Sequence, residues 1–274
     1  MGLSDVSDLA WRVEEACINA WPSPRQVVQG HWLIRFSGGA TRRTNSVNPL
    51  RAERHDPTEI VESAQALYRA QAQPALFRVP SIARGIDGQL EQMNFTYEGE
   101  TCTLFADLSG ATPTWDHGVD LTTKPTGEWL KAKARLTPLQ DNEHWIYEAM
   151  LGAIVAPGAF AATRVGLEIV SVAYGVVHDG LLVVESVVTD PAHRQRGLAR
   201  RTVGKLIDWA CGQAASGAAL QVVADNDAAI LLYRSLGFTR ELYRYHYRRE
   251  PIHRPIARGG EARVQFTARN AGQS

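Results

Sequence analysis

The stretch VVESVVTDPAHRQRGLARRTVGKLIDWA, residues 183–210, decides the fold of this chain. It opens with a run rich in valine, a residue that favours strands, and this run ends at Thr189. From Leu198 to about Ala214 the apolar residues recur at helical spacing, which predicts an amphipathic helix. The loop Arg194–Ala199 joins the two, so the stretch predicts a strand that feeds directly into the start of a helix.

The loop Arg194–Ala199 has the properties of an anion-binding site. The first turn of a helix has unpaired N–H groups and lies at the positive end of the helix dipole. Gly197 lets the backbone approach a ligand closely and adopt torsion angles that other residues avoid, and Ala199 keeps the next turn small. Positive charge that suits a diphosphate comes from Arg194, Arg196 and Arg200.

A second motif, N-x-x-A-x-x-L-Y-x-x-L-G-F, spans Asn226–Phe238. Together with R-x-x-G-x-A after V-x-x-D-P, and with the order of elements across residues 137–247, it resembles the GNAT superfamily of N-acetyltransferases. The resemblance implies an α/β (α+β) fold with a mixed, mostly antiparallel sheet and helices on both faces. It also implies that the chain is an enzyme that uses acetyl-coenzyme A.

The resemblance assigns the coenzyme contacts to particular residues. The pyrophosphate would be held beside Arg194 by the loop and first helical turn, at Gln195, Arg196, Gly197, Leu198, Ala199 and Arg200. The backbone of Val187 and Val188 would pair with the pantetheine arm and polarise the thioester carbonyl, which is an oxyanion-hole role. Asn226 and Ala229 would contact the pantetheine side, and Tyr233 would lie near the thiol.

Acyl transfer places an acid–base demand on the site. An amine with a pKa of about 10.4 is mostly protonated at pH 7, and freeing it costs about 4–5 kcal/mol. Glu185 is the candidate base, because it lies in the apolar run Leu181–Val188, where an unpaired carboxylate is costly. The resemblance makes Tyr233 the general acid for the leaving thiolate.

Each catalytic assignment has a structural alternative. Glu185 can instead face solvent or pair with an arginine, and Tyr233 can be a core aromatic of its helix. Gln221 occupies the position where some GNAT relatives carry a catalytic glutamate, so that base is absent here. The sequence therefore leaves the identity of the base open.

The first half of the chain echoes the second. Its pattern predicts a helix at 6–20, strands at 31–37 and 41–47, a helix at 56–71, a strand at 75–79, a helix at 87–93 and a strand at 100–108. Leu90–Phe95 resembles a degenerate copy of the L-x-x-x-G-F ending, with Asn94 in place of glycine. We therefore expect two tandem GNAT-like domains, at 1–108 and 137–250, joined by a linker at 109–136 and followed by a polar basic tail at 251–274.

The first domain lacks the glycine that a diphosphate loop needs. Residues 44–51, before the Asp56 helix, contain no glycine, so we predict that this half does not bind coenzyme A in the usual way. A degenerate half can still shape the acceptor pocket, because clefts form where domains meet. Candidates to line it are Trp32, Arg35, Arg42, Arg43 and Asn45; the alternative is a core tryptophan and a solvated arginine face.

Composition excludes several other classes. The 29 basic and 29 acidic residues balance, which argues against a chain built to coat nucleic acid or membrane. The three cysteines are far apart, so neither a disulfide framework nor a metal site is expected. No long apolar run or secretory signal is present, and we expect a cytoplasmic protein. Arginines recur in residues 240–269, but no recognition helix accompanies them, which argues against nucleic-acid binding.

The expected function is transfer of an acetyl group from acetyl-coenzyme A to a primary amine of a small molecule or amino acid. One alternative is acetylation of a protein lysine or N-terminus, because acceptor specificity resides in variable loops. Another is a non-catalytic module that only binds an acyl-coenzyme A. The acceptor and the oligomeric state do not follow from the sequence.

Overall fold

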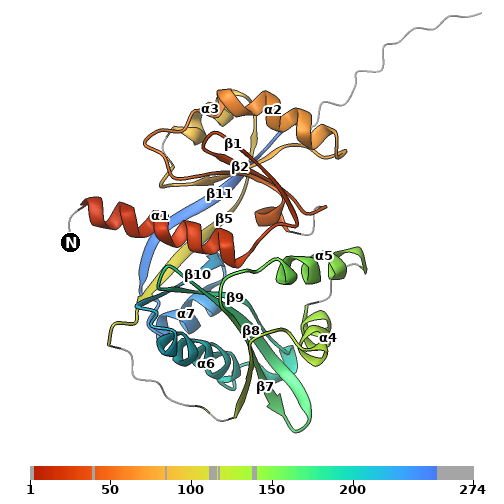
Figure 1. Cartoon of the computed structure of the whole chain (residues 1–274), viewed down its shortest axis with the longest axis vertical. Helices are drawn as coiled ribbons and strands as arrows, with labels where there is room; N and C mark the ends of the chain where they lie inside the picture. Colours follow the sequence, from red (N-terminus) through yellow and green to blue (C-terminus); the bar gives the residue numbers. More distant parts are fainter. Residues whose placement is uncertain are drawn as a thin grey trace, which may run out of the picture.

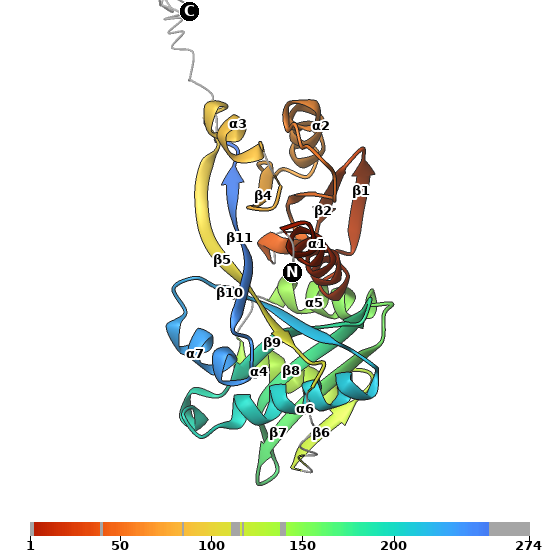
Figure 2. The same ribbon diagram turned by 90° about the vertical axis from the view of Figure 1, so that its left-hand side faces the viewer.

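The computed structural model describes residues 3–38, 41–83, 85–110, 116, 118–137 and 141–251. Within these residues the strands form one 11-stranded sheet in the order β1-β2-β3-β4-β11-β5-β10-β9-β8-β7-β6, with helices on both faces (Figures 1 and 2). The strands are β1 Arg25–Gln29, β2 Trp32–Phe36, β3 Val47–Pro49, β4 Leu76–Pro80, β5 Thr96–Asp107, β6 Val119–Thr122, β7 Gly158–Val165, β8 Glu168–His178, β9 Leu181–Thr189, β10 Gly217–Val223 and β11 Arg240–Arg249. The helices are α1 Leu3–Ala20, α2 Thr58–Arg69, α3 Ile86–Gln92, α4 Gly127–Leu136, α5 Asp141–Gly152, α6 Leu198–Gly212 and α7 Asp227–Ser235, with 3-10 turns η1 Arg42–Thr44 and η2 Pro191–His193.

The chain repeats one arrangement of elements. The first half runs β1-β2-β3-α2-β4-α3-β5, and the second runs β7-β8-β9-α6-β10-α7-β11. In each half three antiparallel strands are followed by a parallel one, since β3 pairs with β4 and β9 pairs with β10 in parallel. The tandem GNAT-like fold predicted from the sequence is therefore confirmed.

The two halves exchange their last strands. β5 belongs to the first half in sequence, yet it lies between β10 and β11 and pairs antiparallel with both. β11 ends the second half, yet it pairs with β4 of the first. In Figures 1 and 2 these two long strands run side by side from one half of the molecule into the other. One continuous sheet results.

The short helices of both halves end in the same way. Asn94 after α3 and Gly237 after α7 have φ values of 62° and 94°, in the left-handed region. In each case the amide of the next residue donates to a carbonyl of the helix. Phe95 N–H donates to Leu90 O at 3.0 Å, and Phe238 N–H donates to Tyr233 O at 3.1 Å. This pattern is the Schellman ending, which glycine or asparagine allows. Residues 90–95 therefore form the same helix ending as the corresponding residues of the second half, as the sequence pattern predicted.

Three clusters of apolar side chains form the interior. One joins α1, α4 and α5 to one face of the second half's sheet, and a second joins α6 and α7 to the opposite face. The third lies in the first half, around α2 and α3. α1 therefore crosses from its own half to cover the sheet of the other (Figure 1), and Tyr174 of β8 donates a hydrogen bond to Ala20 O at 2.9 Å.

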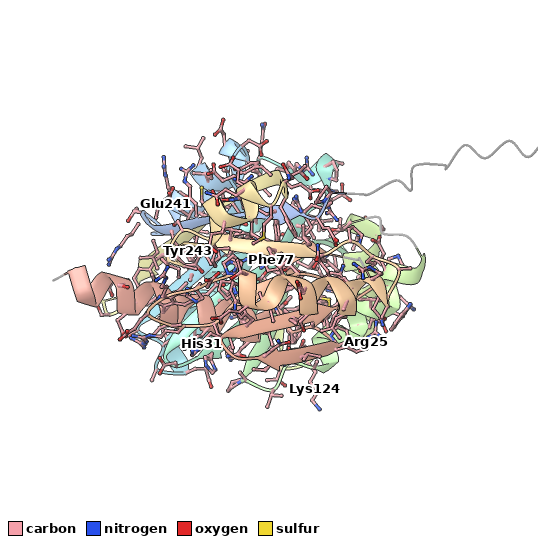
Figure 3. All side chains as sticks on the ribbon, turned by 90° about the horizontal axis from the view of Figure 1, so that it is seen from above. Arg25, His31, Phe77, Lys124, Glu241 and Tyr243 are labelled. Atoms are coloured by element: carbon pink, nitrogen blue, oxygen red, sulfur yellow. The ribbon has the colours of Figure 1, made fainter. Side chains whose placement is uncertain are left out.

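The edge of the first half is exposed. All five residues of β1 are exposed, and β1 is the last strand on its side of the sheet. Figure 3 looks onto this half, with Phe77 and Tyr243 toward the middle and Arg25 and His31 at the border. Phe77 of β4 is fully buried in the core of this half, and Tyr243 of β11 is 4% exposed.

Some expected elements differ. The segment expected as a linker contains β6 and α4, and Trp129 of α4 is buried. Its Nε1 donates to Ala161 O at 3.0 Å, a contact with a distant strand that no local pattern reveals. The expected strand at 41–47 is the turn η1 followed by the short β3, and β1 is additional. The tail from residue 252 lies outside the described residues. No described helix is long and apolar enough to cross a membrane.

Candidate active site

β9 and β10 part at the centre of the second half. Their parallel ladder ends at Val184 and Leu220, although both strands continue. Just beyond this point β9 bulges, because Ser186 has φ of 55° and the pairing with β8 shifts register. A bulge re-aims side chains and interrupts pairing. The result is a notch in the sheet where main-chain groups of β9 have no β10 partner.

Side chains reach the notch from both faces of the sheet. Glu185 follows the alternation of Leu181 and Val183, so it lies on the face covered by α1 and α5. Beyond the bulge Val187 packs with the α6 and α7 cluster and Val188 with the opposite one. Both valines are half-buried. The proposed oxyanion backbone thus lies at the notch.

Glu185 is paired with an arginine of the other half. Arg43 donates from both terminal nitrogens to Glu185, at 2.7 and 2.8 Å, and Glu185 is only 5% exposed. Arg43 also donates to Gln221 Oε1 at 3.2 Å and lies 4.3 Å over the Trp21 ring. Burial by itself would lower the pKa of Arg43, but the charge and hydrogen bonds of Glu185 raise it.

The pair extends into a buried polar network. Gln221 Nε2 donates to the Tyr243 hydroxyl at 3.4 Å, and that hydroxyl donates to Glu14 at 2.5 Å. Glu14 in turn pairs with Arg78, and both are buried. The network joins α1, η1, β4, β9, β10 and β11, so it fixes the two halves against each other at the notch.

Tyr233 of α7 belongs to the apolar cluster that also contains Val184 and Leu220, where the β9–β10 ladder ends. It is 8% exposed, and its ring packs edge-on to Phe238 at 6.1 Å. Burial, and after it the charge of Glu185, raises the pKa of Tyr233 to about 12. Its hydroxyl has no hydrogen-bond partner among the described residues. A phenol in this setting stays protonated at neutral pH and is available as a donor.

The start of α6 is open. Gly197 is the residue before the helix, with φ of 73°, and no side chain caps the first amides. A Cβ at Gly197 would meet no protein atom within 4 Å. Gln195 is also left-handed, with φ of 59°, and residues 194–197 are exposed. Free amides therefore face solvent, beside the side chains of Arg194 and Arg196.

Hydroxyl groups tie this helix start to the sheet. Thr202 Oγ1 lies 2.7 Å from Thr163 Oγ1 and donates to Ser171 Oγ at 3.1 Å. All three side chains are fully buried. Leu198 and Ala199 follow the loop, buried and half-buried respectively. These hydroxyl contacts anchor the first turns of α6 to β7 and β8.

Other predicted coenzyme residues have local structural roles. Arg200 donates to the Ser235 carbonyl and hydroxyl at 2.9 and 2.8 Å, which links α6 to the end of α7. Asn226 caps α7, since its Oδ1 accepts from Ala229 N–H at 3.1 Å. Asn226 is exposed and Ala229 half-buried, on the same face of the sheet as Tyr233.

The equivalent helix start in the first half differs, because an acidic side chain lies at its first amide. Asp56 accepts from the N–H and hydroxyl of Thr58 at 3.0 and 2.6 Å, at the start of α2. The hydroxyl first, and then the amide, lower the pKa of Asp56. A carboxylate therefore already accepts from the first amide of α2, and its negative charge lies beside the positive end of that helix.

The first half supplies residues that the sequence marked only as candidates. Of the five, Arg43 reaches the notch, while Trp32 is core, as its alternative stated. The alternative that the arginines form a solvated face is wrong for Arg35, which is 3% exposed. Arg35 donates to Ile18 O and Trp21 O, both at 2.9 Å. Arg42 lies 4.9 Å over the Tyr247 ring, and Asn45 donates to Gln73 at 2.7 Å. The described residues contain no group of three or more ligand side chains that could hold a metal.

Comparison with known proteins agrees with this geometry. The family model described as "Probable histone acetyltransferase Rv0428c C-terminal" matches residues 9–248. The uncharacterized N-acetyltransferase YobR of Bacillus subtilis is 23% identical over 248 residues, or 86% of this chain and 97% of that protein. N-alpha-acetyltransferase RimI of Mycobacterium tuberculosis is 44% identical over 66 residues, or 24% of this chain and 40% of RimI.

Solved structures share the fold. A GCN5-related N-acetyltransferase from Kribbella flavida has a TM-score of 0.66 at 18% identity, covering 92% of this chain and 96% of that one. A tandem GNAT protein from the clavulanic acid biosynthesis pathway has a TM-score of 0.57 at 13% identity, covering 75% and 74%. The notch, the open glycine start of α6 and the family match together lead to one assignment: the chain belongs to the "Probable histone acetyltransferase Rv0428c C-terminal" family and is a GNAT-type N-acetyltransferase.

Proposed function

We propose that this chain moves the acetyl group of acetyl-coenzyme A to a primary amine of a small molecule or amino acid. The observation that carries the proposal is the notch between β9 and β10, together with the uncapped start of α6, the helix that follows β9 in the chain. The donor would enter from the α6 and α7 face. The acceptor would enter from the face that carries Glu185.

The donor site fits a diphosphate. Four amides at the start of a helix lack intrahelical partners, and here no side chain caps them. The open space at Gly197 lets the ligand approach the main chain. Arg194 and Arg196 supply charge, whereas Arg200 contributes by holding α7 against α6. The pantetheine arm would then run along the unpaired edge of β9 toward Val187 and Val188.

The proposed reaction is a direct attack by the amine. The amine nitrogen forms a bond to the acetyl carbon, the carbon–sulfur bond breaks, and the sulfur leaves as a thiolate. The amine's proton passes to Glu185, whose two oxygens keep free lone pairs beside the bonds to Arg43. Tyr233, which its raised pKa keeps protonated and which has no hydrogen-bond partner among the described residues, gives its phenolic proton to the departing sulfur, and the phenolate then regains a proton from solvent.

Enclosure of the acceptor face favours a small acceptor. Glu185 is 5% exposed, and the elements above it come from both halves of the chain. Arg43 lies over the Trp21 ring, and Trp21 packs 6.0 Å from the ring of Tyr147 of α5, whose hydroxyl is 2.8 Å from Ser186 Oγ. A slender amine fits such a site better than a folded protein surface.

Acetylation of a protein is the second candidate. It is favoured by the description of the matching family, which names a histone acetyltransferase, and by the similarity to RimI, named as an N-alpha-acetyltransferase. A panel of amino acids, small amines, lysine peptides and peptides with free N-termini separates the two candidates, with release of free coenzyme A thiol as the readout. We expect turnover with small amines to exceed that with every peptide. Faster turnover with the peptides would favour the second candidate.

Gly197→Glu tests the donor site. A carboxylate at this position repels the diphosphate and fills the space above the amides, so acetyl-coenzyme A binding measured by calorimetry should be lost. Gly166→Glu is the matched control, because Gly166 also has a positive φ, of 60°, and open space around its Cβ, but lies in the β7–β8 turn. Equal affinity in the two variants would remove the proposed donor site.

A further inference from the structure

A pocket of about 310 Å³ lies between α4 and α5, and of its lining residues only Tyr147 has been placed near the proposed reaction site. Both helices cover the acceptor face of the sheet. The residues that line the pocket are Gly127, Leu130, Lys131, Lys133, Ala134, His144, Tyr147 and Glu148. Three of these carry or can carry positive charge, and one carries negative charge.

Lys133 is buried without a counterion. It is 8% exposed, and no carboxylate among the described residues pairs with it. Its ammonium lies 4.9 Å from the centre of the Tyr147 ring, a contact that offsets only part of the cost of burying a cation. Burial lowers the pKa of Lys133 to about 8, so the group is still mostly protonated at pH 7.

The same ring connects the pocket to the notch. One face of Tyr147 contacts Lys133, while its hydroxyl lies 2.8 Å from Ser186 Oγ in the β9 bulge. Ser186 is the neighbour of Glu185. The buried cation is therefore one side chain away from the position where the amine must react.

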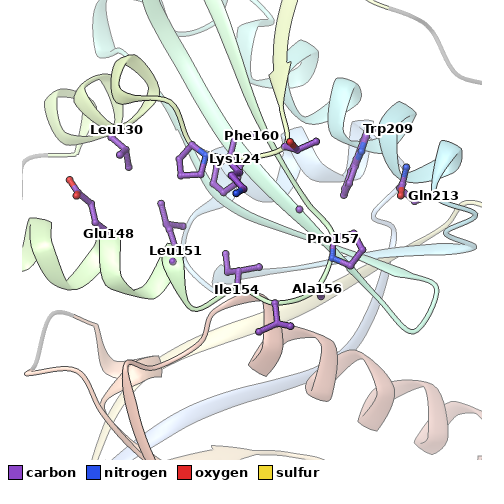
Figure 4. Close-up of a pocket in the computed structure, with 15 residues that line it drawn as sticks. Lys124, Leu130, Glu148, Leu151, Ile154, Ala156, Pro157, Phe160, Trp209 and Gln213 are labelled. Carbon is purple, nitrogen blue, oxygen red and sulfur yellow. The ribbon is translucent and has the colours of Figure 1, made fainter.

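A second, larger pocket adjoins this one. It has a volume of about 720 Å³ and shares Leu130 and Glu148 with the first. Figure 4 shows these two residues at one side of it, with Phe160 and Trp209 farther along. Most of its lining side chains are apolar, and Lys124 and Gln213 are among the polar exceptions. The two pockets together offer an anion site followed by an apolar surface.

We propose that the pocket between α4 and α5 binds a carboxylate of the acceptor, with Lys133 as the cation that recognises it. The acceptor class is then an amine that also carries a carboxylate and an apolar body, as an apolar amino acid does. The charged groups facing the pocket are Lys131 and Lys133 from α4, and His144 and Glu148 from α5. Of these, Lys133 is the one that is buried. This inference rests on the proposed function.

A binding experiment tests it without requiring turnover. The full chain is titrated with 3-phenylpropionate and, separately, with 3-phenylpropionamide, and ligand-observed NMR reports saturable binding. The carboxylate should bind and the amide should bind about tenfold more weakly or not at all, because a charge-assisted hydrogen bond is lost. Lys133→Met should reduce the affinity for 3-phenylpropionate to that for the amide.

Lys131→Met is the control for loss of one positive charge from the same helix, and it should keep most of the affinity. The melting temperature of Lys133→Met should not fall, since an apolar side chain replaces a buried cation. No saturable binding of 3-phenylpropionate, or equal binding to Lys133→Met, would overturn the inference.

Turnover gives a second readout. With L-phenylalanine and L-phenylalaninamide as acceptors, Lys133→Met should raise KM about tenfold for the first alone, the change expected from one charge-assisted hydrogen bond. An equal change for both would overturn the carboxylate role. These results are distinct from failure of the proposed function, which would appear as no binding of acetyl-coenzyme A to the unaltered chain.

Discussion

Arg43 and Glu185 come from different halves, yet they form the central contact of the site. Removing one partner of such a buried pair leaves the other charge unpaired away from water. The loss in folding stability is about 3–5 kcal/mol. Lysine at position 43 would not replace the arginine, since only the planar guanidinium matches both carboxylate oxygens. Variants of either residue must therefore be assayed for stability as well as for rate.

Glu185→Gln and Tyr233→Phe separate the two proton-transfer roles. Each should lower kcat by about 10²-fold or more, the contribution typical of a general base or acid, and leave the affinity for acetyl-coenzyme A nearly unchanged. Steady-state kinetics and calorimetry measure the two quantities. Unchanged kcat in one variant would remove that residue from the mechanism, and a lost melting transition would identify a structural role instead.

The pH profile adds a check on Tyr233. Because its pKa is raised to about 12, the acid form is present below that pH and is lost only above it. The unaltered enzyme should therefore show no alkaline decline from this residue between about pH 8 and 10, where an ordinary phenol with a pKa of about 10 would begin to ionise. A decline in kcat within that window that disappears in Tyr233→Phe would show that Tyr233 ionises there, which would contradict its raised pKa.

At the scale of elements, the endings of the helices position the site. Gly237, which follows α7, has a left-handed backbone conformation, and the N–H of the next residue, Phe238, donates a hydrogen bond to Tyr233 O. The residue proposed as the acid is thus fixed by its own helix ending. The bulge of β9 follows Glu185 directly, at the point where the pairing with β8 shifts register and the ladder with β10 has ended.

Gly237→Ala should destabilise the protein by about 1–2 kcal/mol, because a Cβ disfavours the left-handed conformation. Space is not the cause, since the nearest atom to the added Cβ is 3.8 Å away. Gly204→Ala in the middle of α6, also without steric conflict, should instead stabilise by about 0.5–1 kcal/mol. Urea denaturation measures both, and equal effects would refute the conformational explanation.

At the scale of the molecule, strand exchange makes the two halves depend on each other. β5 fills the space between β10 and β11, so the second half without it has two unpaired strand edges. The polar network from Glu14 to Glu185 crosses the same boundary. We propose that the first half has kept this structural role and supplies Arg43, while only the second half binds acetyl-coenzyme A.

A fragment of residues 116–251 should therefore fail to fold alone, and its thermal scan should lack a cooperative transition. Co-expression with residues 1–110 supplies α1 and β5 and should restore a complex that co-elutes in size-exclusion chromatography. The full chain should bind one acetyl-coenzyme A by calorimetry. A separately folded, coenzyme-binding fragment, or two sites in the full chain, would contradict the proposal.

The sequence by itself determined the strand, glycine turn and helix of residues 183–210, as well as the repeated helix endings at Asn94 and Gly237. These features depend on contacts within a few residues, and periodicity and glycine conformation report such contacts directly. Local pattern also led to the tandem fold, because each half repeats the same order of elements.

Only the tertiary structure decided which half each last strand joins, that Arg43 pairs with Glu185, and that Lys133 is buried beside Tyr147. Lys133 lies in a segment whose turn-rich composition predicted a linker, and α4 becomes a helix on the sheet because Trp129 packs into a distant core. Such contacts join residues far apart in the chain, and their free energy comes from burial and pairing that exist only after folding. No local pattern encodes them.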